Sequence, residues 1–140
     1  MDNIHNDNIF ACQAELMLFT ISADGKATQE EFGAACTILA TSYGPGITVE
    51  AAQARLAQHQ NAILETCQTE IQMKERIGGL IGTIKTLTTL AERKPLYLQL
   101  EMIARADGLS SEEVRLLSVI RKGWELPENI FEESVESLGL

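Results

Sequence analysis

The sequence predicts an all-α protein, a compact bundle of about seven helices in a single domain that spans residues 1–140. Of its 140 residues, 45% are hydrophobic, which is enough to form a core. Aromatic residues make up only 5%, a balance that favours interdigitating helices over sheets. The third observation is a repeat, because Ala-Asp-Gly occurs at 23–25 and again at 106–108. Each copy lies between an apolar segment and an acidic one, as in two related helix-turn-helix units.

The first Ala-Asp-Gly motif separates the first two predicted helices. Residues 4–22 carry apolar side chains at spacings of three and four, which indicate one face of a helix that should end at Asp24-Gly25. Thr28 and Glu31 match a capping box, in which a hydroxyl and a carboxylate bond free backbone N–H groups, so the second helix should begin near Thr28. The apolar residues of the first stripe are Phe10, Ala14, Met17 and Ile21.

Glycine, proline and cap residues divide the middle of the chain. The segment SYGPG at 42–46 should end the second helix, and Thr48 should open the third. In the Ala- and Gln-rich stretch that follows, QHQN at 58–61 is expected to be a short joint between two helices. Gly78 and Gly82 lie one helical turn apart and predict a kink or a tight helix crossing, because each glycine costs about 1 kcal/mol against alanine inside a helix.

The second half of the chain repeats the signals of the first. Pro95 fits the first turn of a helix that should end at Asp107-Gly108. Ser110 and Glu113 form a second capping-box pattern, and the helix they open should end at Gly123. The remaining expected features are Trp124, as a lid over the core or an interface anchor, and a final acidic helix over 127–138.

The two Ala-Asp-Gly motifs align with a shift of 83 residues, from Asp24 to Asp107 (107 − 24). An apolar helix leads into each copy, and a capped helix leads out of it. Neither unit can bury its apolar face alone, so the two are expected to pack about a pseudo-twofold axis or by parallel stacking. At this shift the paired positions are Thr28 with Ser111, Glu30 with Glu113, and Glu31 with Val114.

These motifs resemble the TerB-like family, small all-helical proteins named for bacterial tellurite resistance. The resemblance rests on SADGKATQEEF at 22–32 and RADGLSSEEVRLL at 105–117, and it covers most of the chain. It implies a mostly helical bundle, a non-enzymatic function in bacterial stress response, and a metal ion bound by acidic residues near the two Asp-Gly turns. Transferred residue by residue, the implied ligands are Asp24 with Glu30 or Glu31 in the first copy, and Asp107 with Glu112 or Glu113 in the second.

A hard cation, Ca²⁺ or Mg²⁺, is the expected ion, because the candidate ligands are carboxylate oxygens, which these cations prefer. An EF-hand loop is excluded, since Asp24 is the only carboxylate among the four residues before Gly25. The ligands would therefore have to converge from both turns. The open alternative is that Asp24 and Asp107 only stabilise the turns, while the glutamates favour the helix starts through capping and the macrodipole.

Charge and composition exclude several other classes of function. A net charge of −9 argues against nucleic acid as a partner, because such binding depends on Lys and Arg. No stretch approaches the roughly 18 apolar residues of a membrane span, so direct membrane insertion is not expected. Neither a G-x-S-x-G motif nor a zinc-type Cys/His spacing is present, which argues against nucleophilic catalysis and zinc binding. Three cysteines without a C-x-x-C pair fit a reducing, cytoplasmic compartment.

The sequence therefore predicts a cytoplasmic, TerB-like helical module that binds a divalent cation or a protein partner. A metal-free protein–protein interaction adaptor is the alternative function. The sequence leaves open the oligomeric state, the partner and the identity of the ion.

Overall fold

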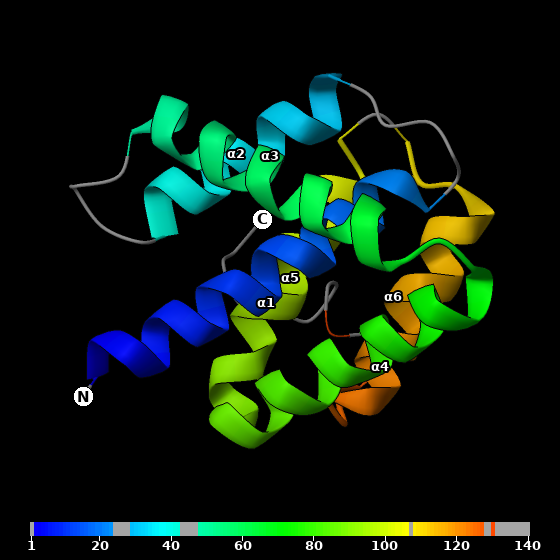
Figure 1. Cartoon of the computed structure of the whole chain (residues 1–140). Helices are drawn as coiled ribbons and strands as arrows, with labels where there is room; N and C mark the ends of the chain where they lie inside the picture. The colour runs from blue at the N-terminus through cyan, green and yellow to red at the C-terminus, as the bar shows by residue number, and fades with distance from the viewer. Residues whose placement is uncertain (1, 24–28, 43–47, 107, 128–129, 131–140) are drawn as a thin grey trace.

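The computed structural model describes residues 2–23, 29–42, 48–106, 108–127 and 130. These residues form six α-helices and no strand, so the all-α prediction is confirmed (Figure 1). Apart from residues 127 and 130, the helix expected over 127–138 lies outside the described part of the chain. The six helices are α1 (Asp2–Ser22), α2 (Gln29–Ser42), α3 (Val49–Thr66), α4 (Glu70–Leu87), α5 (Leu90–Ala104) and α6 (Ser111–Gly123).

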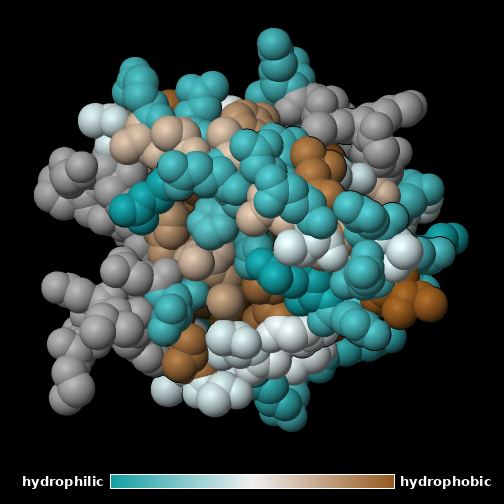
Figure 2. Space-filling view, in the orientation of Figure 1, coloured by the Kyte–Doolittle hydropathy of each residue, from teal (hydrophilic) through white to brown (hydrophobic). Residues whose placement is uncertain are grey.

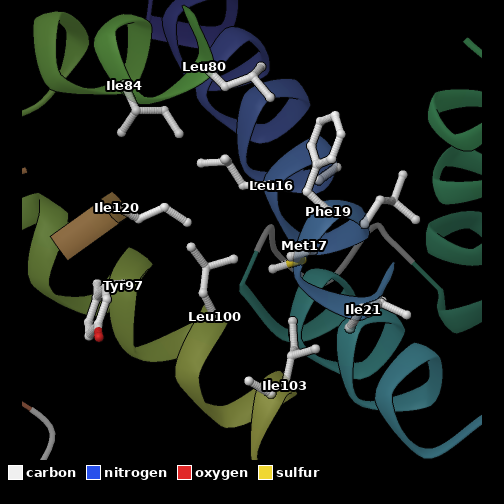
Figure 3. Close-up of a cluster of buried hydrophobic side chains, with 14 of the residues drawn as sticks. Leu16, Met17, Phe19, Ile21, Leu80, Ile84, Tyr97, Leu100, Ile103 and Ile120 are labelled. Atoms are coloured by element: carbon white, nitrogen blue, oxygen red, sulfur yellow. The ribbon is translucent and has the colours of Figure 1, made fainter. Parts of the chain in front are cut away.

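Helix α1 is the centre of the bundle and contacts each of the other five helices. All nine residues from Gln13 to Ile21 are buried. The sequence predicted a single apolar stripe on α1, whereas the structure covers this part of the helix on all sides. Its polar residues are paired, since Gln13 bonds Leu96, Glu15 pairs with Arg76 and Thr20 bonds Leu16. Figure 3 shows Leu16 and Phe19 leaving α1 in different directions, each into the core.

Helices α1 and α5 run in the same direction through the core. The side-chain Nε2 of Gln13 in α1 donates to the carbonyl oxygen of Leu96 in α5 at 2.8 Å. Further along both helices, Ile21 and Ile103 lie in the same lower part of the hydrophobic cluster in Figure 3. Both helices therefore finish at the same end of the molecule, and in the sequence each is followed by its Ala-Asp-Gly motif.

Helix α3 is continuous, so the predicted joint at 58–61 is wrong. This segment contains neither Gly nor Pro, and the Ala, Gln and Leu residues around it are good helix formers. Polar residues on an exposed face require no interruption of the helix. The predicted start of this helix is confirmed, because Thr48 is its N-cap and the Thr48 hydroxyl accepts a hydrogen bond from the Ala51 amide at 3.1 Å.

Helix α5 begins at Leu90 and not near Pro95, where the sequence analysis placed its first turn. Thr89 and Glu92 form a capping box, in which the Thr89 amide donates to Oε1 of Glu92 at 2.9 Å. Pro95 therefore lies inside the helix, where it removes one backbone donor. The T-x-x-E spacing at 89–92 is the sequence signal that identifies the true start.

The glycines of α4 face solvent, which corrects the predicted kink or tight crossing. A Cβ atom added at Gly78, Gly79 or Gly82 would have no neighbouring atom within 4 Å, apart from the helix's own nearby backbone. The close approach involves instead Gly123 at the end of α6, where an added Cβ would lie 2.7 Å from Cγ2 of Ile81 in α4. The predicted kink or tight crossing at these glycines is wrong because larger apolar side chains occupy the buried face of α4.

Trp124 closes the core directly after α6, which ends at Gly123 as predicted. Its side chain is fully buried, and its indole Nε1 donates to the carbonyl oxygen of Ile81 at 3.1 Å. Arg93 of α5 donates from Nη1 to the Trp124 carbonyl oxygen at 2.9 Å. Of the two sequence interpretations of Trp124, the lid over the core is therefore confirmed and the exposed interface anchor is wrong.

Candidate functional site

The predicted acidic clusters lie around the starts of α2 and α6. Their aspartates, Asp24 and Asp107, fall outside the described residues, so the structure describes only the glutamates. Glu31 is the third residue of α2, and Glu113 is the third residue of α6. The shift between equivalent helix positions is therefore 82 residues (113 − 31) and not the 83 that aligns the two aspartates. At a shift of 82 residues Glu31 aligns with Glu113, whereas at 83 it aligns with Val114. Both helices therefore carry a glutamate at this position.

Glu113 is fully buried at the start of α6. Its Oε1 accepts a hydrogen bond from the Ser110 amide at 3.1 Å, and its own amide donates to the Ser110 hydroxyl oxygen at 3.1 Å. This is the capping box that the sequence predicted. The other carboxylate oxygen, Oε2, is buried and has no hydrogen-bond partner within the described part of the chain. A buried carboxylate oxygen without a partner is costly.

The remaining glutamates of the predicted site divide into one buried and two exposed side chains. Glu31 is 1% exposed and occupies the position in α2 that Glu113 occupies in α6. Glu30 and Glu112 are exposed to solvent, and Oε2 of Glu112 accepts a hydrogen bond from the Ser111 hydroxyl at 3.2 Å. Each copy of the motif thus turns one glutamate inwards and one outwards. The third position of a capping box is the sequence signal that separates the two.

Within the described residues, no group of three or more His, Cys, Asp or Glu side chains is close enough to hold a metal ion. The glutamates alone therefore do not make a complete cation site. Any such site needs Asp24, Asp107 or water as further ligands, because Ca²⁺ takes six to eight oxygen ligands and Mg²⁺ takes six.

Comparison with models of known protein families, with characterised proteins and with solved structures gives no match for this chain. Among the helices that the structure describes, none is both long and apolar enough to cross a membrane. Functional inference therefore depends on the local chemistry of the residues and on the TerB-like resemblance of the two motifs.

Tyr97, Glu101 and Arg105 form a polar network along α5, which the sequence did not predict. The Tyr97 hydroxyl donates to Oε1 of Glu101 at 2.9 Å, and Nε of Arg105 donates to Oε2 of Glu101 at 3.2 Å. These side chains line a cleft of about 290 Å³. Burial, and then the hydrogen bond to Glu101, raise the pKa of the Tyr97 hydroxyl well above its ordinary value of 10.0. Residues spaced by four on one helix gave the only sequence signal for this network.

A second surface feature lies where α3 is followed by α4. Leu64, Ile71 and Met73 are 66%, 70% and 40% exposed. Leu64 and Met73 line an apolar cleft of about 150 Å³ whose floor includes the buried residues Leu18 and Phe19. In Figure 2, hydrophobic surface is visible at the right-hand edge, over the start of α4, among hydrophilic residues. We call this cleft, with the exposed Leu64 and Met73 that line it, the α3–α4 apolar surface.

The three cysteines are free thiols with different degrees of burial. Burial raises the pKa of the Cys36 thiol. Burial and the nearby Glu15 carboxylate raise the pKa of the Cys12 thiol. The positive charge of Arg76 lowers this pKa, but by less, so it stays above its ordinary value. Both shifts favour the protonated thiol, and the thiolate is the nucleophilic form. These environments fit the interpretation of Cys12 and Cys36 as core residues.

Proposed function

We propose that this chain is a non-enzymatic, TerB-like stress-response protein that binds a divalent cation, Ca²⁺ or Mg²⁺, beside the start of α6. One observation supports the site most directly: Oε2 of Glu113 is buried and has no hydrogen-bond partner among the described residues. The capping box uses Oε1 only, so Oε2 is available to a cation. The TerB-like resemblance of the two Ala-Asp-Gly motifs supports the stress-response function and the choice of Asp107 as a second ligand.

Electrostatics favours an ion at this position. A carboxylate that is removed from water needs a positive charge or a hydrogen-bond donor near each oxygen to stay ionised at little cost. Among the residues that the structure describes, the Ser110 amide is the one hydrogen-bond partner of the Glu113 carboxylate. A divalent cation at Oε2 would supply the missing interaction.

Calorimetric titration with Ca²⁺, Mg²⁺ and Zn²⁺ tests the proposal. We expect saturable binding of Ca²⁺ or Mg²⁺ that is at least about tenfold weaker in Glu113→Gln and in Asp107→Asn, since each substitution removes one charged ligand. Glu112→Gln is the matched control, because it changes the neighbouring, exposed glutamate, and it should bind as the wild type does. Absence of saturable binding up to millimolar cation, or equal binding by Glu113→Gln, would contradict the proposal.

The first copy of the motif decides whether the two turns share one ion. If the ligands converge, Asp24→Asn and Glu31→Gln weaken the same binding event that Asp107→Asn weakens. If each turn binds its own ion, they remove a second, independent event. Glu30→Gln is the matched control in α2, because Glu30 is exposed whereas Glu31 is buried.

The second candidate is a metal-free protein–protein interaction adaptor. The α3–α4 apolar surface favours it, because large exposed apolar side chains grouped around a cleft mark sites of protein binding. Co-purification in the presence of EDTA tests this function. We expect a partner that the wild type retains without metal and that a Leu64→Ser, Met73→Ser double variant loses.

A further inference from the structure

We propose that the cleft between α5 and α6 binds a small organic acid, with the carboxylate on Arg121 and an apolar body against α6. This is the cleft of about 290 Å³ that Tyr97, Glu101 and Arg105 line, and we call it the α5–α6 cleft. It is distinct from the cation site at Glu113 and from the α3–α4 apolar surface.

One face of each helix lines the cleft. The lining residues are spaced by three or four along their helix, so those of one helix share a face. The end of α6 lies beside the start of α5, since Nη1 of Arg93 donates to the carbonyl oxygen of Trp124 at 2.9 Å. The lining residues that carry the argument are Tyr97, Glu101 and Arg105 of α5 and Val114, Ser118 and Arg121 of α6.

Arg121 carries the unpaired positive charge of the cleft. Its Nη1 donates to the carbonyl oxygen of Leu126 at 3.1 Å, which holds the guanidinium in place without neutralising it. Within the described residues no carboxylate pairs with Arg121, and the nearby Glu125 pairs with Lys85 at 3.2 Å. None of the other guanidinium N–H groups of Arg121 is buried without a partner, so they are accessible from the cleft. A guanidinium presents a planar fork of donors that matches a carboxylate.

The carboxylate already present in the cleft does not compete for Arg121. Oε1 of Glu101 accepts the Tyr97 hydroxyl at 2.9 Å, and Oε2 accepts Nε of Arg105 at 3.2 Å, so both oxygens are used. Two arginines and one glutamate give the cleft a net charge of +1 (+2 − 1). The charge of −9 on the whole chain is screened beyond about 8 Å at physiological ionic strength. The local charge therefore favours one carboxylate and opposes an amine.

The Tyr97 hydroxyl adds no negative charge to the cleft. In Figure 3 this hydroxyl points away from Ile120. Burial and the hydrogen bond to Glu101 raise its pKa, whereas the charges of Arg121 and Arg105 lower it by less. Both guanidinium groups therefore lie near a hydroxyl that stays neutral at physiological pH.

The apolar side of the cleft offers a surface for the body of the ligand. Leu117 is buried, whereas Val114 and Leu109 are 48% and 38% exposed. A ligand chain that covers them removes this apolar surface from water. The hydroxyl of Ser118, which bonds to no other described residue, adds a donor for the carboxylate. The cleft has about twice the volume of a cavity that holds one benzene ring, so an acid of about twelve non-hydrogen atoms fits.

NMR titration of the isotope-labelled protein in EDTA tests the inference. The probe is phenylbutyrate, and the comparison ligands are its neutral amide, phenylbutylamine and acetate. We expect saturable, one-to-one binding of phenylbutyrate with a dissociation constant below about 1 mM. Its affinity should be at least about tenfold higher than that of each comparison ligand, because a charged hydrogen bond or the apolar contact is missing in each. The affinity should fall with added salt.

Matched variants of α6 locate the site. Arg121→Gln should weaken phenylbutyrate binding at least about tenfold, whereas Arg115→Gln, at an exposed position outside the cleft lining, should bind as the wild type does. Val114→Ser should weaken binding about threefold to tenfold through lost apolar contact. Its control is Val119→Ser, which is 55% exposed and outside the cleft lining. Because Val114 is exposed, its variant decides the test even if Arg121→Gln fails to fold.

Three results would overturn the inference. Equal affinity for the neutral amide would show apolar binding without recognition of the carboxylate. Unchanged affinity in Val114→Ser and in folded Arg121→Gln, or no saturable binding up to about 10 mM phenylbutyrate, would exclude the cleft as the site. At least tenfold tighter binding of a short peptide that ends in phenylalanine, lost in the same variants, would identify a protein C-terminus and not a small acid as the ligand. Since EDTA removes divalent cations, each result leaves the proposed cation site to its own test.

Discussion

Two pairs of helices adjoin the Ala-Asp-Gly motifs, α1 with α2 and α5 with α6, and we call each pair a unit. The two units share one feature of their second helices but differ in how they contact the rest of the core. Each second helix buries a glutamate at its third position, Glu31 or Glu113. The end of α6 then packs on α4 through Gly123 and Trp124. At the 82-residue shift, the first unit has Thr41 and Ser42 at these positions.

The first helices of the two units differ in polarity. Helix α5 carries the buried pair of Tyr97 and Glu101, whereas the positions 83 residues earlier are Ala14 and Leu18 (97 − 83 and 101 − 83). Leu18 and Ala14 belong to the apolar core around α1. The two units therefore share the buried glutamate of their second helices. The contacts of each unit with the rest of the core involve side chains that differ between the two units.

The largest expected effect is that of removing Trp124, which has no counterpart in the first unit. Trp124→Ala should destabilise the protein by about 3–5 kcal/mol, because it opens a cavity in the core and removes the bond to Ile81. Urea unfolding followed by circular dichroism measures this, since Trp124 is the only tryptophan available for fluorescence. Trp124→Phe keeps most of the apolar volume and should cost clearly less. Equal costs for the two variants would show that the hydrogen bond, and not the packing, matters.

Glycine-to-alanine substitutions in α6 and α2 should have opposite signs. Gly123→Ala should cost about 1–3 kcal/mol, because the new Cβ would lie 2.7 Å from Ile81 and the buried side chain must move. Gly33→Ala in α2 has no neighbouring atom within 4 Å and should stabilise the protein by about 0.5–1 kcal/mol through helix propensity. Thermal and urea unfolding measure both. Changes of the same sign would mean that α6 does not approach α4 this closely.

Two adjacent serines test the 82-residue shift between the helix starts. Ser110→Ala should cost about 1 kcal/mol, because the Ser110 hydroxyl accepts the hydrogen bond of the Glu113 amide in the capping box. Ser111→Ala should change the free energy of unfolding by less than about 0.5 kcal/mol, because Ser111 is an exposed residue inside the helix. If Ser111→Ala instead lowered the unfolding free energy more than Ser110→Ala, Ser111 would be the N-cap. The helix starts would then align at 83 residues.

An effect as large as that of Ser110→Ala is expected at alkaline pH, from the Tyr97 network of the second unit. The pKa of Tyr97 is raised in the folded protein above its ordinary value of 10.0, so the folded state keeps a proton that the unfolded state loses. Stability from this group is fully present below pH 10 and falls as the pH rises above it. Between pH 10 and 11 we expect a loss of about 1 kcal/mol.

Tyr97→Phe is the control for the alkaline effect. This variant has no titrating hydroxyl at the site, so the difference in unfolding free energy between wild type and variant should shrink as the pH rises from 10 to 11. A difference that stays constant over this range would contradict the raised pKa. The first unit, which has Ala14 and Leu18 at the equivalent positions, makes no such contribution.

Most helix ends could be predicted from the sequence because they depend on short-range hydrogen bonds. The start at Thr48 and the capping box of Ser110 with Glu113 were predicted correctly. The prediction for the start of α5 is wrong because Pro95 is tolerated inside this helix, whose start depends on the capping box of Thr89 and Glu92. The joint expected at 58–61 was wrong because polar residues alone do not interrupt a helix.

The candidate site could be predicted only in part. The residue types at the two motifs were visible in the sequence, yet burial distinguishes Glu113 from Glu112 and Glu31 from Glu30. The network of Tyr97 and Glu101 and the exposure of Leu64 and Ile71 depend on which neighbouring helices cover each face. Spacing along one helix does not contain that information.

The sequence by itself determined the helical class, the approximate positions of most helices and the two related helix starts, because caps, propensity and apolar spacing act within a few residues of the chain. Only the tertiary structure decided that α1 is enclosed by all five other described helices, that the close crossing involves Gly123 and not the glycines of α4, and that the α3–α4 apolar surface stays exposed. Such features depend on how separate helices share a limited buried volume, since close packing covers one face of a helix at the expense of another.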